Sequence, residues 1–514
     1  MKFQYILTWL GLLLCAPTIL KAQDFLRVEA GVKMNLGSSQ LVLHETSVAF
    51  FDSVAATNAR IVFTGDQDLV FFSNNTPIAQ LELQLDPFHE VALASDMQIT
   101  ESLTFSALTN RLILQTNDLL LGDVAQVQGA GPNNYIVTNE TGYVFKDNLG
   151  PMPFLFPVAD DTVDYTPILV AENQTPGRYG VRAQTNVLTN GDAGAPLTTG
   201  VADVSWEIVG GTPGERNLML NAQWEGTDEL AFFDRNRCGL AHYGPTSTTW
   251  DLMATDVFPA SGADPYTRER NNVTEIGYFA VGGEALASDG QAEVDVFLGG
   301  GYQGGGLMTD ALRENGLLPT QEPFTGLGFT QKGFGGGETV APGVFTPTGP
   351  DAIVDWVLVE VREADDFNNI IATRSGLLQR DGDIVDTDGV SPLRLAGLPP
   401  TSYYMSIQHR NHLGVMTATP LDFSTGNVEF SFLVDPDQAF GSSNGVADLG
   451  DGFYGLISGD FDRNGQVQNT DASGLTQTLG NPGYQQGDLD LNGQVQNIDL
   501  QLKLSPNLGR GRQF

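Results

Sequence analysis

Two stretches near the C-terminal end of this 514-residue chain repeat the same spacing of oxygen-bearing side chains. Residues 459–471 read GDFDRNGQVQNTD, and residues 487–499 read GDLDLNGQVQNID. In a twelve-residue calcium loop, oxygen donors stand at positions one, three, five and twelve, and glycine at position six allows a sharp turn. Counted from its first aspartate, each stretch places a suitable residue at all of these positions. The spacing therefore predicts two calcium sites.

The predicted ligands occupy the same five positions in both copies. They are Asp460, Asp462, Asn464, the carbonyl of Gln466 and Asp471 in the first loop, and Asp488, Asp490, Asn492, the carbonyl of Gln494 and Asp499 in the second. Val467 and Val495 stand at position eight, where we expect apolar side chains to bring the two loops back to back. The alternative is a pair of acidic turns that bind nothing, and the matched duplication favours binding.

This duplicated loop, with a short helix-forming stretch after it, resembles the repeat of dockerins. The resemblance implies a small helical module at residues 454–514, bound Ca²⁺ and a cohesin-like protein partner. Two features depart from the family pattern: the first helix must end by Gly480-Asn481-Pro482, and loop positions ten and eleven hold Asn469-Thr470 and Asn497-Ile498, where dockerins often present Ser or Thr. Position twelve is Asp, whereas a full EF-hand has Glu there.

Other patterns that could carry chemistry are weaker. The glycines of residues 299–304 match a dinucleotide fingerprint, but no βαβ unit surrounds them, so we interpret them as a loop of a β-domain. His409 and His412 do not have the spacing of a helical zinc site, and we expect ordinary surface or turn histidines. The acidic turn at residues 381–388 is either a solvated hairpin, a third calcium site or, least favoured, a pair of glycosidase carboxylates. No catalytic constellation emerges, and we predict that the chain is not an enzyme.

Charge and cysteine content indicate the compartment and exclude some partners. The chain has 62 acidic and 25 basic residues, a net charge of -37, which argues against nucleic acid or an anionic membrane as partner. Residues 1–22 resemble a signal peptide, with Lys2 before a short apolar run, and no later segment is apolar enough to span a membrane. Only Cys238 would remain after cleavage, so the secreted protein would contain no internal disulfide.

The rest of the chain has the pattern of an all-β protein. From residue 23 to 150, short apolar runs recur about every ten residues between turns, which predicts a β-solenoid or, as the alternative, a sandwich. Residues 151–287 predict a β-sandwich. Residues 292–435 predict an immunoglobulin- or fibronectin-like sandwich, with a clean alternation in DWVLVEVR at 355–362. Residues 436–453 form the predicted linker to the tail.

This order of modules resembles exported surface proteins of Gram-negative bacteria. Two motifs support the resemblance: RDGD at residues 380–383 and HRNHLGVM at 409–416. The stretch that contains them is similar to a module of haemagglutinin-type proteins. The resemblance implies a secreted adhesive or structural protein at the cell surface, exported by a type IX-like route. The alternative is a non-catalytic subunit that binds a surface glycan or that plugs its tail into a cohesin-like receptor.

Overall fold

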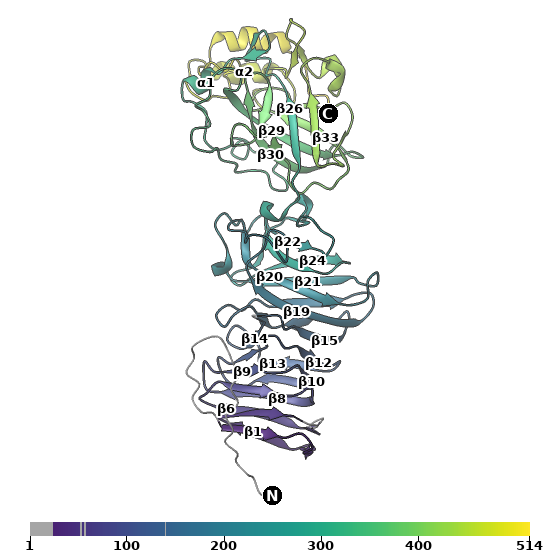
Figure 1. Ribbon diagram of the computed structural model, residues 1–514. Coiled ribbons are helices and arrows are strands. Elements are labelled where there is room, and N and C mark those ends of the chain that lie inside the picture. The colour runs from purple at the N-terminus through teal and green to yellow at the C-terminus, as the bar shows by residue number, and fades with distance from the viewer. Residues whose placement is uncertain (1–23, 52–53, 56–57, 139) are drawn as a thin grey trace. The chain divides into compact units, whose positions relative to one another are not determined.

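The computed structural model describes residues 24–514 except 52–53, 56–57 and 139, so the predicted signal peptide lies outside the described residues. The described chain is mostly β, as predicted (Figure 1). It divides into two compact units. The first unit extends to Pro167 and includes Pro176–Ala183, and the second comprises Ile168–Thr175 and Gln184–Phe514. No described helix has the length and apolar character that crossing a membrane requires.

Two parallel sheets build the first unit. One contains, in order, β1 (Asp24–Val28), β4 (Thr46–Phe50), β7 (Leu69–Phe72), β9 (Glu90–Leu93), β11 (Arg111–Ile113), β14 (Tyr135–Val137) and β17 (Val158–Ala159). The other contains β3 (Gln40–His44), β6 (Arg60–Gly65), β8 (Pro77–Leu85), β10 (Met97–Phe105), β12 (Leu119–Leu121) and β15 (Val144–Leu149), and antiparallel β19 (Gly177–Thr185) follows β15. Two short strands, β2 (Met34–Asn35) and β5 (Val54–Ala55), pair with each other, and β13 (Gln126–Gln128) pairs with β10.

The first unit confirms the solenoid rather than the sandwich alternative. Successive strands of one sheet pair in parallel, so that Ile61 lies beside Leu81 and Leu81 beside Leu103. All three side chains are fully buried, and they form one ladder of the core. A strand about every ten residues gives this result because each coil contributes one strand to each sheet.

The second unit begins with two sets of antiparallel strands. One set is β22 (Gly239–Tyr243), β25 (Tyr278–Gly282) and β20 (Val201–Gly210). The other is β18 (Ile168–Glu172), β21 (Leu218–Trp224), β24 (Tyr266–Val273) and β23 (Ser261–Gly262). The side chains of Trp206 and Trp224 are both fully buried. These strands account for most of the region predicted as the first sandwich.

Nine described strands then form one sheet, called here the nine-stranded sheet. Its order is β32 (Leu393–Arg394), β26 (Gln291–Asp295), β31 (Asp383–Val385), β30 (Ile370–Gln379), β29 (Ile353–Glu363), β33 (Ser402–Gln408) and β34 (Val415–Met416), with β35 (Leu421–Asp422) beside β33 and β36 (Asn427–Ser431) beside β26. Small elements flank it: the pair β27 (Tyr302–Gly304) and β28 (Leu307–Met308), and the short helix α1 (Ala311–Glu314).

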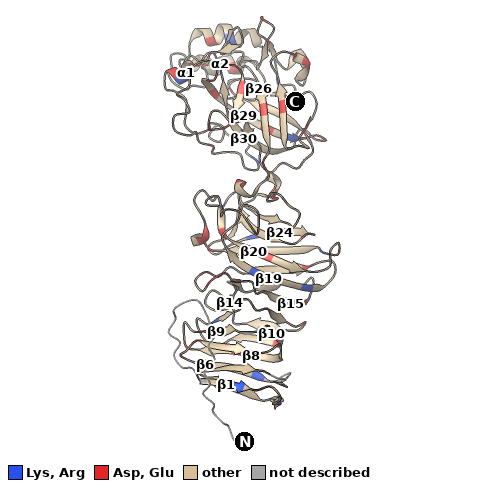
Figure 2. Ribbon diagram, in the orientation of Figure 1, with Lys and Arg blue, Asp and Glu red and all other residues tan. Residues whose placement is uncertain are grey.

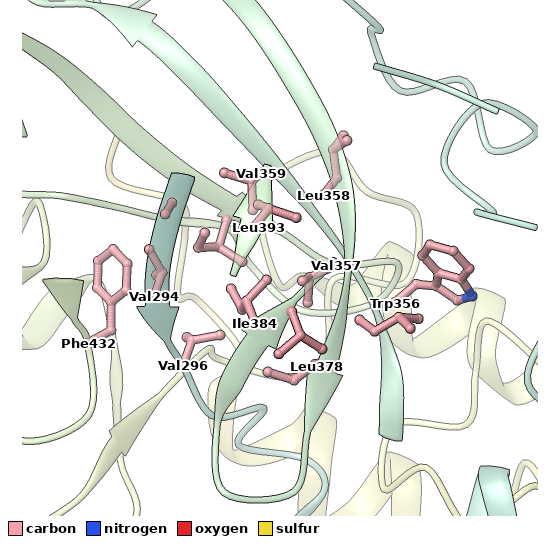
Figure 3. Packing of buried hydrophobic residues seen from close by; sticks show 14 of the residues in the cluster. Val294, Val296, Trp356, Val357, Leu358, Val359, Leu378, Ile384, Leu393 and Phe432 are labelled. Atoms are coloured by element: carbon pink, nitrogen blue, oxygen red, sulfur yellow. The ribbon is translucent and has the colours of Figure 1, made fainter. Parts of the chain in front are cut away.

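Both faces of the central strand β29 are buried. Val357 points toward Leu378 and Ile384, whereas Trp356 lies on the other side of the strand (Figure 3). The second face is covered by the turns between α1 and β29, where Trp356 Nε1 donates a 2.9 Å hydrogen bond to the carbonyl of Pro319. The predicted alternation is present, and both of the faces that it separates are buried.

The tail contains little regular structure. The pair β37 (Ala447–Asp448) and β38 (Tyr454–Gly455) leads to the first loop, α2 (Asn469–Gln477) follows it, and the π-helical η6 (Asp499–Leu504) with the 3₁₀ turn η7 (Ser505–Asn507) follows the second loop. In the segment predicted as a linker, Ala439 and Val446 are buried in the core of the nine-stranded sheet. The tail and this sheet belong to one compact unit.

Candidate metal centre

Each predicted loop gathers its three aspartates. Carboxylate oxygens of Asp460, Asp462 and Asp471 lie within 4.8 Å of one another, and the equivalent oxygens of the second loop, from Asp488, Asp490 and Asp499, do the same. In the described part of the chain, these are the groups of three or more potential ligands that meet this distance. Oxygen-only donors of this kind suit hard divalent cations.

Backbone amides in the first loop hold the carboxylates in place. Gly465 N donates to Asp460 Oδ2 at 3.1 Å, and Asp462 N donates to Asp471 Oδ1 at 3.0 Å. Gln468 N donates to the other Asp471 oxygen at 2.8 Å, which fixes the first turn of α2 against the loop. The glycine is required because the backbone at Gly465 has φ 82°, in the left-handed region.

The second loop repeats these bonds. Gly493 N donates to Asp488 Oδ2 at 2.9 Å, Asp490 N to Asp499 Oδ1 at 3.0 Å and Gln496 N to Asp499 Oδ2 at 2.7 Å. Gly493 has φ 90°. The same residue types at the same positions form the same hydrogen bonds in both loops. The loop conformation is therefore determined locally by the Asp, Asn and Gly residues.

The remaining predicted ligands line the same turns. Asn464 Oδ1 accepts from Gln466 N at 2.9 Å, and Asn492 Oδ1 accepts from Gln494 N at the same distance. Each asparagine amide also donates to the aspartate two residues earlier. The structure therefore brings both asparagines to the acidic clusters, and both glutamines follow directly after the sharp turn.

Asp460 carries an oxygen that lacks a hydrogen-bond partner. The residue is only 6% exposed, its Oδ2 accepts from Gly465 N, and its Oδ1 is buried with no partner. Burial, together with the charges of Asp471 and Asp462, raises the pKa of Asp460 to about 7. A buried unpaired carboxylate oxygen is costly, so this atom needs a cation or a proton.

Asp488 stands in an equivalent electrostatic position. Burial raises its pKa to about 7, the charges of Asp490 and Asp499 act in the same direction, and the nearby Arg410 guanidinium opposes them. Burial and the charge of Asp499 also raise the pKa of Asp490. Each loop thus concentrates negative charge that solvent screens poorly.

Val467 and Val495 share one apolar core, but the loops are not paired by their backbones at these positions. Both valines are fully buried in a cluster that also contains Leu475, Leu489 and Leu504. The first loop instead bridges from Gln466 to Gly511, and the second from Gln494 to Pro482. The expected approach of the two loops is therefore made by side chains alone.

In the acidic turn at residues 381–388, two carboxylates have partners within the protein. Asp386 makes an ion pair with Arg374 at 2.9 Å, and Asp388 Oδ1 accepts from the amides of Val390 and Ser391. Among the described residues, this turn does not bring three carboxylates within ligand distance of one another.

The chain's few Lys and Arg residues are scattered over the described ribbon (Figure 2).

A buried polar network lies beside the second loop, and no sequence pattern indicates it. His409 and His412 lie in a turn after β33, as expected, but they are only 2% and 1% exposed. Their Nδ1 atoms are 3.0 Å apart, and His409 Nε2 lies 3.2 Å from the buried carboxylate of Asp355. The alternation of β29 could have drawn attention to Asp355, because it is the one charged residue among the first seven residues of the strand, Ile353 to Val359.

Comparison with models of known protein families, with curated proteins and with solved structures finds no match to this chain.

Proposed function

We propose that the C-terminal tail binds two calcium ions, one in each duplicated loop, and that these ions stabilise a non-catalytic protein of the cell exterior. The observation that carries the proposal is Asp460, whose buried Oδ1 has no partner inside a cluster of three carboxylates. A bound cation would supply that partner. It would also offset the burial and the repulsion between carboxylates that together raise the pKa of Asp460 and Asp488.

Calcium is favoured over other cations by the donor chemistry. Both clusters offer carboxylate and amide oxygens, without a described histidine or cysteine among the residues of the cluster. Such donors are poor ligands for zinc, which prefers nitrogen and sulfur. A turn of alternating side-chain donors suits the six to eight flexible ligands of calcium better than the strict octahedron of magnesium.

The wider role that we propose is surface display, in an adhesive or structural protein. The support is the succession of a parallel solenoid, antiparallel sheets and a nine-stranded sheet, with a strongly acidic composition. Cys238, the one cysteine among the described residues, is buried and free, so no described disulfide stabilises these modules. Calcium at about 1,000 times its dissociation constant adds roughly 4 kcal/mol per site, comparable to the effect of a disulfide.

A second candidate is that the tail docks into a cohesin-like partner. It is favoured by exposed apolar side chains at the end of the second loop and after it: Ile498 is 39% exposed, Leu502 62% and Leu508 43%. Loop positions ten and eleven are exposed in both copies. Apolar residues at such positions suit a protein surface better than a soluble glycan.

Calorimetric titration of calcium into the full chain tests the proposal. We expect two ions per chain, one ion for Asp460→Asn and one for Asp488→Asn. Asp66→Asn, at an exposed aspartate of the first unit, makes the same charge change and should keep both ions. Magnesium should bind more weakly. Absence of calcium binding by the unchanged chain would contradict the proposal.

A further inference from the structure

We infer that the second loop is a latch: its ion binding is coupled to its docking on the nine-stranded sheet, whereas the first loop is not coupled in this way. The inference rests on the proposed calcium binding and extends it to one interface within the chain. The residues that receive the loop are the turn at 409–412, called here the docking turn, together with Asp355 and the glycines at 299–301. None of them is a predicted ligand.

The docking turn bonds directly to the backbone of the second loop. Asn411 Nδ2 donates to the carbonyl of Asp488 at 2.9 Å and to the carbonyl of Gln486 at 3.1 Å. Arg410 Nη1 donates to the carbonyl of Gln485, and Gln486 Nε2 donates back to the carbonyl of Arg410. The asparagine thus fixes the peptide of the residue at loop position one, where the ligand set begins.

Asp355 is the buried anchor of the same contact. Its Oδ1 accepts from the hydroxyl of Tyr484 at 2.6 Å, and its Oδ2 accepts from Arg410 Nε at 3.0 Å. The Arg410 guanidinium also lies over the Tyr484 ring, 4.2 Å from its centre. Asp355 and Arg410 are almost wholly buried, so these opposite charges are paired where solvent cannot replace a lost partner.

The shape of the sheet side matches the loop closely. A side chain on Gly300 would place its Cβ 1.9 Å from the carbonyl oxygen of Leu489, and a Cβ added to Gly301 would lie 3.0 Å from Leu491 Cδ1. The glycines at 299–301, which belong to the match to a dinucleotide fingerprint, therefore leave room for the backbone of the second loop. Leu491 completes the contact, because it is fully buried in the core of the nine-stranded sheet.

The first loop, from Asp460 on, bonds through its backbone to the chain's own C-terminal segment. The docking turn bonds to the residues just before that loop: Gly459 N donates to the carbonyl of Asn411 at 3.1 Å, and Ser458 forms a bridge with His412. Val467 N donates to the carbonyl of Arg510 at 2.9 Å, and Arg512 N donates to the carbonyl of Gly465 at 2.8 Å. Its residues Asp462, Arg463 and Asn464 are exposed. Loss of an ion from this loop should loosen the loop and the last residues without releasing the sheet.

Coupling follows from the shared atoms. An ion in the second loop holds Asp488 and its peptide in the position that Asn411 binds, and docking holds the same peptide in the position that the ion requires. Each event therefore favours the other by the same free energy.

Hydrogen exchange on the full chain tests the coupling. With calcium present, Asp488→Asn should lose amide protection across residues 405–416 and 353–362, to the level of the unchanged chain in chelator. Asp460→Asn should keep it. Equal loss of protection in both variants, or in neither, would overturn the inference.

A second variant tests the latch without touching a ligand or removing a core side chain. Tyr484→Phe removes the hydroxyl that donates a hydrogen bond to Asp355. Such a bond contributes about 1 kcal/mol, which corresponds to about a fivefold change in affinity. Combined with Asp460→Asn, which leaves only the second site, it should weaken calcium binding about fivefold. Combined with Asp488→Asn, which leaves only the first site, it should change nothing.

The outcomes separate the two proposals. No calcium binding by the unchanged chain would remove the proposed function itself. Two bound ions, with a Tyr484→Phe effect that is equal at both sites or absent at both, would leave calcium binding intact and overturn the latch. Gly300→Ala should weaken the second site like Tyr484→Phe, whereas Gly326→Ala, at an exposed glycine whose added Cβ meets only ordinary contact at 3.5 Å, should not.

Discussion

The two loops have the same ligand pattern but different surroundings. Position four is the exposed Arg463 in the first loop and the fully buried Leu491 in the second, although both residues have left-handed φ angles, 61° and 59°. Position three is the exposed Asp462 in one and the half-buried Asp490 in the other. Ligand geometry is therefore a local property of the repeat, whereas the role of each site depends on residues far away in the sequence.

The largest expected effect is that of removing both ions. Chelator should lower the free energy of unfolding of the second unit by several kcal/mol, since each site contributes roughly 4 kcal/mol at high calcium. Thermal unfolding followed by calorimetry, with and without chelator, measures this change. The solenoid of the first unit has neither acidic cluster and should unfold at an unchanged temperature, which serves as the internal control. A shift in the unfolding temperature of the solenoid, or no shift in that of the second unit, would contradict this expectation.

The next effect is a pH dependence that appears only without calcium. Asp460 and Asp488 have pKa values of about 7 when folded, above the value of about 3.9 for an unfolded aspartate. The folded state then binds protons more tightly at these two groups, so their contribution to stability is fully present below pH 4 and is lost as pH rises toward 7. A shift of this size corresponds to about 4 kcal/mol per group at most. Unfolding by denaturant in chelator between pH 4 and pH 8 should show this loss, and saturating calcium should abolish it.

The variants Asp460→Asn and Asp488→Asn sharpen that test, because each removes one of the raised groups. In chelator, each should flatten part of the pH dependence. An increase in stability with rising pH, in the absence of calcium, would mean that these carboxylates are not the groups that govern it.

Much of this architecture follows from the sequence because it depends on local patterns. The ten-residue spacing of short apolar runs predicts the solenoid, and the Asp, Asn and Gly positions predict both loops. The short helix after the first loop, α2, also ends before Gly480 as predicted. In each case the determining residues are neighbours along the chain.

What the sequence does not reveal depends on contacts between distant segments. The docking turn, Asp355 and Tyr484 are separated by many residues, and nothing near His409 or His412 indicates that they are buried. The strand β29 is covered on its second face by turns without any periodic pattern, so its alternation did not indicate that both of its faces are buried. The role of the glycines at 299–301 depends on the close approach of Leu489, which is far away in the sequence.

A third effect distinguishes position four of the two loops. Leu491→Ala removes a fully buried side chain from the core of the nine-stranded sheet and should cost about 3 kcal/mol of unfolding free energy. Arg463→Ala, at the same position of the first loop, should change it by less than about 0.5 kcal/mol, because this side chain is exposed. Denaturant unfolding of both variants in saturating calcium measures the difference. Similar costs at the two positions would show that the loops are embedded alike.

The smallest expected effect concerns the arginine beside each loop. Arg512 lowers the pKa of Asp460 from an exposed position, whereas Arg410 acts on Asp488 from a buried one. Arg512→Ala removes one screened positive charge and should strengthen calcium binding at the first site by two- to threefold, or less than about 1 kcal/mol. The backbone bond from residue 512 to Gly465 does not need the side chain, so the loop keeps its path.

Titration of Arg512→Ala in the Asp488→Asn background isolates this site, and the gain should shrink as salt is added, because the interaction is exposed. The same variant in the Asp460→Asn background should bind as tightly as its parent. The corresponding change at Arg410 cannot be small, since it would leave Asp355 without its buried partner as well as removing a charge near Asp488. Weaker binding by Arg512→Ala would mean instead that this side chain clamps the first loop, and the two sites would then differ less than their exposure suggests.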